Sequence, residues 1–126
     1  MLSFVVAGML AVAAQDPGQW QDFGAASDGE LVSLNLDSIE TGAEGPEAVV
    51  RVRYARAAAN GAVTADYRSA FNCRARTAAR LLMGERDAKD EIVSRNDEGE
   101  RVPPVAAAAG SAWGKVLDEV CAQAGG

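Results

Sequence analysis

Residues 63–73 read VTADYRSAFNC, and this stretch decides how the chain is expected to fold. Its odd-numbered positions are mostly apolar or small: Val63, Ala65, Tyr67, Ser69, Phe71 and Cys73. Its even-numbered positions are mostly polar: Thr64, Asp66, Arg68, Ala70 and Asn72. A period of two is typical of a β-strand with one face buried and the other in solvent. We therefore predict a strand over residues 63–73, with Cys73 on its buried face.

Two stretches upstream show the same alternation. Residues 30–39 read ELVSLNLDSI, and residues 47–56 read EAVVRVRYAR, in which valines alternate with arginines. Asn-Gly at residues 60–61 is the strongest hairpin signal in the chain, because both residue types tolerate a positive φ. Residues 27–29 are predicted to form a turn and residues 41–46 a loop. These features predict consecutive antiparallel strands, and the aromatic run WQDF at the chain's Trp20 is expected to start the sheet.

The segment that follows Cys73 carries mixed signals. Its alanines, arginines and leucines over residues 74–83 favour a helix locally. We prefer a strand there, because Gly84 and Asp87 then form a turn into a further strand over residues 91–94. Three more segments are expected to lie outside regular structure: a turn at residues 96–99 (NDEG), a break at residues 102–105 (VPPV) and a linker at residues 106–110.

The last segment has helical periodicity. Its apolar residues fall on one helical stripe: Trp113, Val116, Leu117, Val120 and Cys121. Ser111 is positioned as the N-cap, and Gly125-Gly126 is expected to end the helix. Isolated helices shorter than about 12–15 residues are marginal in water, so this helix needs the sheet. The predicted fold class is α+β: an antiparallel β-sheet meander with one C-terminal helix packed on one face and tied to it by a disulfide.

Residues 1–14 read MLSFVVAGMLAVAA, an uncharged apolar run that ends in small residues. A membrane-spanning helix needs about 20 such residues, so the run is too short to span a bilayer comfortably. These are features of a secretory signal peptide, which would leave residues 15–126 as a single domain without a transmembrane span. The alternative is a buried N-terminal strand or helix.

Export changes how the two cysteines are interpreted. In an oxidising compartment, an isolated pair such as Cys73 and Cys121 is more often a structural disulfide than a reactive dithiol. A bond between them would join the buried face of a strand to the apolar stripe of the last helix. The alternative is two buried free thiols. The predicted location is the periplasm or the cell surface.

Composition argues against several classes of function. The chain has 126 residues, 18 acids against 12 bases and a formal net charge of -6, which makes it a poor binder of nucleic acid. It contains no histidine, which removes the usual general base and the commonest metal ligand. We therefore expect no enzyme activity, no cofactor and no metal. A carboxylate-dependent site at Asp87, Asp90 and Glu91 is an alternative, although a solvated loop is the simpler interpretation.

Five arginines occupy positions predicted to face away from the helix: Arg51, Arg53, Arg68, Arg74 and Arg76. On neighbouring strands they would form a basic patch that accepts carboxylates or sulfates of a partner. Arg51, Arg53 and Arg68 are the candidate partner-binding residues. The alternative is that these arginines form cross-strand ion pairs with Asp37, Asp66 and other acids.

The order of these features resembles the bacterial surface-adhesin protein E family. The features that carry the resemblance are the leader, Trp20, a strand ending near residues 37–39, Tyr67-x-Ser69 followed by Cys73 and Arg76, and a final Trp113 with Val120-Cys121. The resemblance implies an antiparallel sheet whose concave face is tied to a C-terminal helix by Cys73–Cys121. The family's best-known member is an outer-membrane adhesin that contacts host matrix and serum proteins and can form a homodimer.

The sequence thus predicts an exported, non-enzymatic cell-envelope protein that binds a protein or glycan partner. Two alternatives belong to other classes. One is a structural or inhibitory periplasmic module that inserts a rigid loop around residues 102–105 into an enzyme. The other is a small carboxylate-dependent hydrolase.

Overall fold

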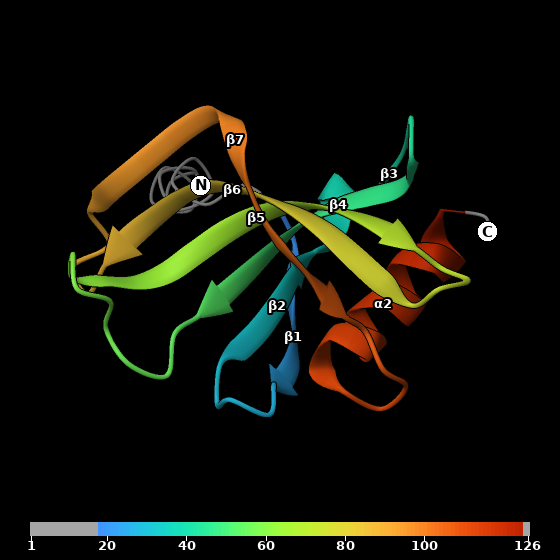
Figure 1. The fold of residues 1–126 in the computed structure, drawn as a ribbon, viewed down its shortest axis with the longest axis horizontal. Helices are drawn as coiled ribbons and strands as arrows, with labels where there is room; N and C mark the ends of the chain where they lie inside the picture. The colour runs from blue at the N-terminus through green and yellow to red at the C-terminus, as the bar shows by residue number, and fades with distance from the viewer. Residues whose placement is uncertain (1–17, 125–126) are drawn as a thin grey trace, which may run out of the picture.

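A computed structural model describes residues 18–124. It is mostly one antiparallel sheet of seven strands, followed by a helix (Figure 1). The elements are β1 (Trp20–Ala25), β2 (Leu31–Asn35), the 3-10 turn η1 (Leu36–Ser38), β3 (Glu40–Gly42), β4 (Gly45–Arg53), β5 (Ala62–Asn72), β6 (Thr77–Asp87), β7 (Ile92–Ala106) and α2 (Ala112–Gln123). The strand order is β1-β2-β4-β5-β6-β7, with β3 paired to β4. The signal-peptide prediction for residues 1–14, and the expected helix end at Gly125-Gly126, lie outside the described residues.

Strand β5 confirms the alternation from which its position was predicted. Ala65, Tyr67, Ser69 and Phe71 are buried, whereas the residues between them are half-buried. Because β5 lies between β4 and β6 near the middle of the sheet, its buried face fixes which side of the sheet forms the core. We call this side the core face and the other side the opposite face.

The core joins side chains of the sheet and of helix α2 in one cluster. The helix contributes Trp113, Val116, Leu117 and Val120. Strands β2, β4 and β5 contribute chiefly Val32, Leu34, Val50, Val52, Tyr67 and Phe71. Burial of these apolar surfaces stabilises the short helix, as its length requires.

The predicted disulfide is confirmed. Cys73 and Cys121 are bonded, their Cα atoms lie 6.2 Å apart and 48 positions separate them along the chain. Cys73 follows the end of β5, and Cys121 lies in the last turn of α2. The bond therefore joins the central strand to the helix that shares its core. The predicted N-cap is also confirmed, since the Ser111 hydroxyl accepts a hydrogen bond from the Gly114 amide at 3.0 Å.

Three predictions upstream of β5 are wrong in whole or in part. Residues 30–39 do not form one strand, because η1 separates β2 from β3. At this break the Ser38 hydroxyl accepts a hydrogen bond from the Val49 amide and donates one to the Asn35 carbonyl, so a side chain replaces part of the ladder. Residues 41–46 are not a loop, because β3 and β4 pair there through Gly42 and Gly45. Strand β4 also ends at Arg53 rather than at residue 56.

The prediction of a strand and not a helix over residues 74–83 is confirmed, but its bounds differ. Strand β6 runs from Thr77 through Gly84 to Asp87. The turn follows Asp87, whose carboxylate accepts hydrogen bonds from the amides of Lys89 and Glu91 at 2.9 Å each. Gly84 does not end the strand, because it pairs with Asp66 on one side and Arg95 on the other. The hydrogen bonds of the Asp87 carboxylate place this residue in a turn, in agreement with the interpretation of Asp87, Asp90 and Glu91 as part of a loop and not of a catalytic site.

Strand β7 overturns the predictions for residues 96–99 and 102–105. Leu82 pairs with Glu100 and Gly84 pairs with Arg95, so residues 96–99 bulge out of the ladder instead of reversing the chain. The two prolines fall between Val102 and Val105, which both pair with β6. Because β7 is an edge strand, it tolerates prolines that a central strand would not.

Ser69 gives a stability prediction. Its side chain is fully buried on the core face, and its hydroxyl has no hydrogen-bond partner among the described residues. An unpaired buried hydroxyl costs free energy, so Ser69→Ala is expected to leave the free energy of unfolding unchanged or to raise it by about 1 kcal/mol. Urea unfolding checks this, with Ser94→Ala as the control, because the Ser94 hydroxyl donates to Glu85 at 3.0 Å. A loss for Ser69→Ala as large as for the control would contradict it.

Candidate functional site

The opposite face carries two ordered rows of side chains that cross the strands. The first row, which we call the Asp66 row, consists of directly paired residues on six strands: Asp22, Ser33, Arg51, Asp66, Gly84 and Arg95. Side chains at paired positions of antiparallel strands are close neighbours on the same face. The register of the sheet therefore brings together residues that are widely separated in the sequence.

Hydrogen bonds order the Asp66 row. Arg51 forms a two-pronged contact with Asp66, with Nε to Oδ1 at 2.8 Å and Nη2 to Oδ2 at 3.2 Å. The guanidinium of Arg51 also lies 4.1 Å from the ring centroid of Trp20, within the range of a cation–π contact. At the β1 end of the row, the Ser33 hydroxyl donates to Asp22 at 2.6 Å. Arg51 and Asp66 are thus held in fixed orientations at the centre of the face.

The second row, which we call the Thr64 row, lies beside the first. It consists of Leu31, Arg53, Thr64, Arg86 and Ile92, again paired from strand to strand. Two arginines flank a central threonine, and an aliphatic residue stands at each end. Leu31 is 49% exposed and Ile92 is 56% exposed, and these are the large hydrophobic side chains that the described part of the chain leaves most open. The row therefore combines positive charge at its centre with apolar surface at its ends.

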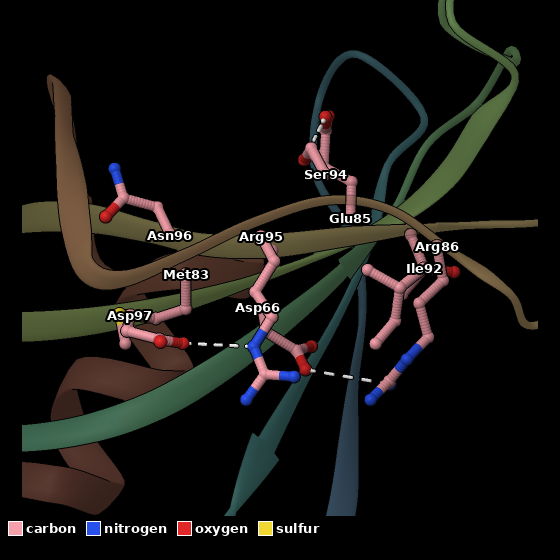
Figure 2. Close-up of a pocket in the computed structure, with 11 residues that line it drawn as sticks. Asp66, Met83, Glu85, Arg86, Ile92, Ser94, Arg95, Asn96 and Asp97 are labelled. Carbon is pink, nitrogen blue, oxygen red and sulfur yellow. Dashed lines mark hydrogen bonds and ion pairs between the residues drawn. The ribbon is translucent and has the colours of Figure 1, made fainter.

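Two hollows follow these rows. One, of about 340 Å³, is lined by residues of both rows and of the β7 bulge, including Asp66, Arg86, Ile92 and Arg95 (Figure 2). Gly84 contributes no side chain to the Asp66 row at this point, which leaves space between Asp66 and Arg95. The other hollow, of about 400 Å³, is lined chiefly by β2 and β4. Thr64, at the centre of the Thr64 row, lines both hollows.

The arginines of the two rows differ in how well they are paired. Arg51 and Arg95 each donate a hydrogen bond to an aspartate, to Asp66 and Asp97 respectively. Arg86 lies 3.8 Å from Asp66 and 3.9 Å from Asp90, distances longer than a hydrogen bond. The guanidinium of Arg53 forms no hydrogen bond or ion pair with any residue of the described range 18–124. The Thr64 row therefore holds the guanidinium groups with the most donor capacity left for a ligand.

The predicted site residues are only partly brought together. Arg51 and Arg53 lie in adjacent rows, while Arg68 lies in a third row and contacts Glu40 at 3.6 Å. The contacts of Arg51 and Arg68 agree with the cross-strand pairs that were the alternative. For Arg74 and Arg76 the predicted placement is wrong: both lie in the turn between β5 and β6.

Arg76 in fact contacts the helix side of the molecule. Its guanidinium donates to the Asp118 carboxylate at 3.0 Å and to the Ala107 carbonyl at 3.1 Å. It also has a positive φ of 57°, which the turn imposes. Arg76 therefore joins the β5–β6 turn to α2 and does not belong to the opposite face.

Thr64, Arg86, Leu31 and Ile92 were not recognised as site residues from the sequence. The alternation in residues 63–73 does place Thr64 on the opposite face. Arg86 was missed because a turn was expected at Gly84, which would have ended the strand before it. The aliphatic residues at the two ends carry no signal of their own, because only the register of four strand pairs aligns them.

A polar cluster lies on the core face at the end of the sheet. Glu85 accepts hydrogen bonds from Tyr54 at 2.6 Å, from Ser94 at 3.0 Å and from Asn60 at 3.2 Å. Figure 2 shows Glu85 and Ser94 directed to the side away from Asp66. The hydrogen bond from Tyr54 holds the pKa of Glu85 below its usual value, while burial and this same contact raise the pKa of Tyr54.

This cluster makes stability depend on pH. A carboxylate whose pKa is lowered by folding contributes stability above its unfolded pKa, about 4.3, and loses it as pH falls through the folded pKa. We expect Tyr54→Phe to remove part of the stability near neutral pH and to flatten the acid limb of the stability curve. Urea unfolding at a series of pH values checks this. An acid limb of unchanged steepness in Tyr54→Phe would contradict the assignment.

Within residues 18–124, no group of three or more acids and cysteines is arranged to hold a metal ion. No helix in that range has the length and apolar character to cross a membrane.

Comparisons with known proteins add no family or relative. No family model, no curated protein and no solved structure matches the chain.

Proposed function

We propose that the protein is an exported, non-enzymatic protein of the cell envelope, periplasmic or at the cell surface, that binds a protein or glycan partner through the opposite face of its sheet. In this proposal, helix α2 covers the core face and leaves the opposite face accessible. The observation that carries it is the pair of cross-strand rows, where four arginines, two hollows and two exposed aliphatic side chains gather on one face.

The chemistry of these side chains suits recognition. A guanidinium presents planar donors that match a carboxylate or a sulfate, and Arg51 is already held in one orientation by Asp66 and Trp20. Such preorganisation lowers the entropic cost of binding a partner. The resemblance to the surface-adhesin protein E family points to the same class of function. The homodimer that this resemblance implies stays a prediction.

A capture experiment tests the proposal. The triple variant Arg51→Ser, Arg53→Ser and Arg68→Ser removes three positive charges from the opposite face. We expect it to lose most of the partner that the unchanged protein recovers from an envelope extract, because charge-assisted hydrogen bonds of about 1.5–3 kcal/mol each are removed.

The control variant removes the same charge elsewhere. Arg56, Arg74 and Lys115 are exposed and lie on loops or on the helix, so changing them to serine keeps the opposite face intact. If both triple variants recover the same partner with unchanged affinity, the opposite face is not the binding site.

The two alternatives lack a supporting observation in this structure. The segment expected to protrude as an inhibitory loop, residues 102–105, belongs to β7 instead. Of the acids considered for a hydrolase, Asp87 accepts hydrogen bonds from its own turn and Asp90 faces Arg86 at 3.9 Å. A structural or inhibitory module and a hydrolase therefore stay hypotheses.

A further inference from the structure

We infer that the partner is a protein that presents an extended acidic segment with an apolar side chain near each end, bound across the strands along the Thr64 row. This inference rests on the proposed function and names the chemistry of the partner.

The centre of the Thr64 row accounts for the acidic part of the segment. Arg53 and Arg86 flank Thr64, and neighbouring strands lie about 4.8 Å apart, so the two arginine backbones are about 10 Å apart. Neither guanidinium donates a hydrogen bond within the described part of the chain. The Thr64 hydroxyl has no such partner there either. A carboxylate placed between the two arginines would accept hydrogen bonds from both guanidinium groups.

The charge of the two rows supports an acidic segment. Together they contain four arginines, Arg51, Arg53, Arg86 and Arg95, and two aspartates, Asp22 and Asp66. Their own sum is +2, and Asp90 and Asp97, which contact Arg86 and Arg95 from outside the rows, bring it to 0. Because the formal net charge of the chain is -6, an acidic segment is repelled less at these rows than elsewhere, and Arg53 is the guanidinium there without an acidic partner among residues 18–124.

The ends of the row account for the apolar parts. Leu31 and Ile92 are separated by four strand spacings, about 19 Å, which an extended peptide spans between its first and about its seventh residue. Both side chains are about half exposed, so a partner that covers them gains apolar burial. A glycan offers hydroxyl groups to these aliphatic side chains, whereas a peptide offers aliphatic side chains in return. The two ends therefore favour a peptide over a glycan.

Nuclear magnetic resonance tests the inference and detects weak binding. The isotope-labelled protein is titrated with the synthetic heptapeptide Leu-Thr-Glu-Thr-Glu-Thr-Val, whose apolar ends and two glutamates lie on one face of the extended chain. We expect saturable shifts centred on the amides of Arg53, Thr64 and Arg86. The same peptide with both glutamates replaced by glutamine is expected to bind at least about tenfold more weakly, because each charge-assisted hydrogen bond that is lost contributes about that factor or more.

Variants of the protein separate the two parts of the row. Arg53→Ser and Arg86→Ser are each expected to weaken binding of the acidic peptide about tenfold. Arg101→Ser is the matched control, because Arg101 pairs with Leu81 in the third row of the same face. This variant should bind the acidic peptide with unchanged affinity. Leu31→Ser together with Ile92→Ser is expected to weaken binding about tenfold through lost apolar burial. Unchanged shifts of core amides show that each variant is folded.

Several outcomes would overturn the inference. Shifts absent up to the solubility limit of the peptide, equal binding of the glutamine peptide, or equal weakening by Arg101→Ser would each do so. A sulfated tetrasaccharide that binds the Thr64 row more tightly than the peptide would show that the partner is a glycan and not a protein. If the peptide does not bind while the triple arginine variant still loses its envelope partner, the acidic segment is rejected as the ligand and the proposed function is retained. If that variant keeps its partner, the proposed function falls as well.

Discussion

Replacing Cys73 and Cys121 with alanine is expected to lower the free energy of unfolding by about 4 kcal/mol. The disulfide closes a loop between residues 48 positions apart, and in the chain-entropy model a loop of that size restricts the unfolded chain by about this amount. Domains of this size are typically stable by about 5–15 kcal/mol, so the loss is a large part of the total.

The element that this bond joins to the sheet is the short helix α2. Helix α2 has 12 residues, too few to be stable alone, and its buried side chains depend on contact with the strands. Equilibrium urea unfolding of the oxidised protein, of the reduced protein and of the double variant measures the effect. The reduced protein and the variant should agree. A loss below about 1 kcal/mol would contradict the expected restriction of the unfolded chain by the bond.

Gly114→Ala is expected to lower the free energy of unfolding by about 3 kcal/mol, although alanine is the better helix former. Gly114 is buried in the first turn of α2, where a Cβ atom would overlap the carbonyl oxygen of Ala108. It would also lie 3.1 Å from the carbonyl oxygen of Ala107. These are backbone atoms, so the helix and the preceding segment must move apart.

The sign of this effect distinguishes close packing from helix propensity. Thermal and urea unfolding of Gly114→Ala measure it, with Lys115→Ala as the control at an exposed position one residue further on. Propensity alone predicts a gain of about 1 kcal/mol for Gly114→Ala. A gain of that kind would show that the helix does not approach the Ala107–Ala108 backbone closely.

The strong periodic patterns predicted the fold well. The alternation in residues 63–73 located the central strand and its buried face, and the helical stripe around Trp113 located α2. Together they placed Cys73 and Cys121 where a bond between them is geometrically reasonable. These patterns involve residues that are close together in the sequence, so they can be recognised without knowledge of the structure.

The errors arise where tertiary contacts override local signals. Turn-forming residues at 96–99 form a bulge, because β7 resumes its pairing with β6 at Glu100. The prolines at 103 and 104 are tolerated, because the edge position of β7 needs fewer backbone donors. Local composition does not indicate whether a strand lies at the edge or in the middle of a sheet.

The candidate site was predictable only in part for a related reason. The alternation assigns Arg51 and Arg53 to the opposite face, as the structure has them. It cannot align residues of different strands, because the register depends on the shifts between Asp66 and Tyr67 and between Glu85 and Arg86. Arg86 and Ile92 entered the Thr64 row only through those shifts.

Site-specific photo-crosslinking in living cells tests the central claim, that the opposite face binds a protein of the envelope, most directly. A photoreactive amino acid replaces Ile92, which is 56% exposed at one end of the Thr64 row, or Lys115, which is exposed on α2. We predict a discrete crosslinked product with a second envelope protein from position 92 and none from position 115. Crosslinks from position 115 alone, or from neither position, would contradict the claim.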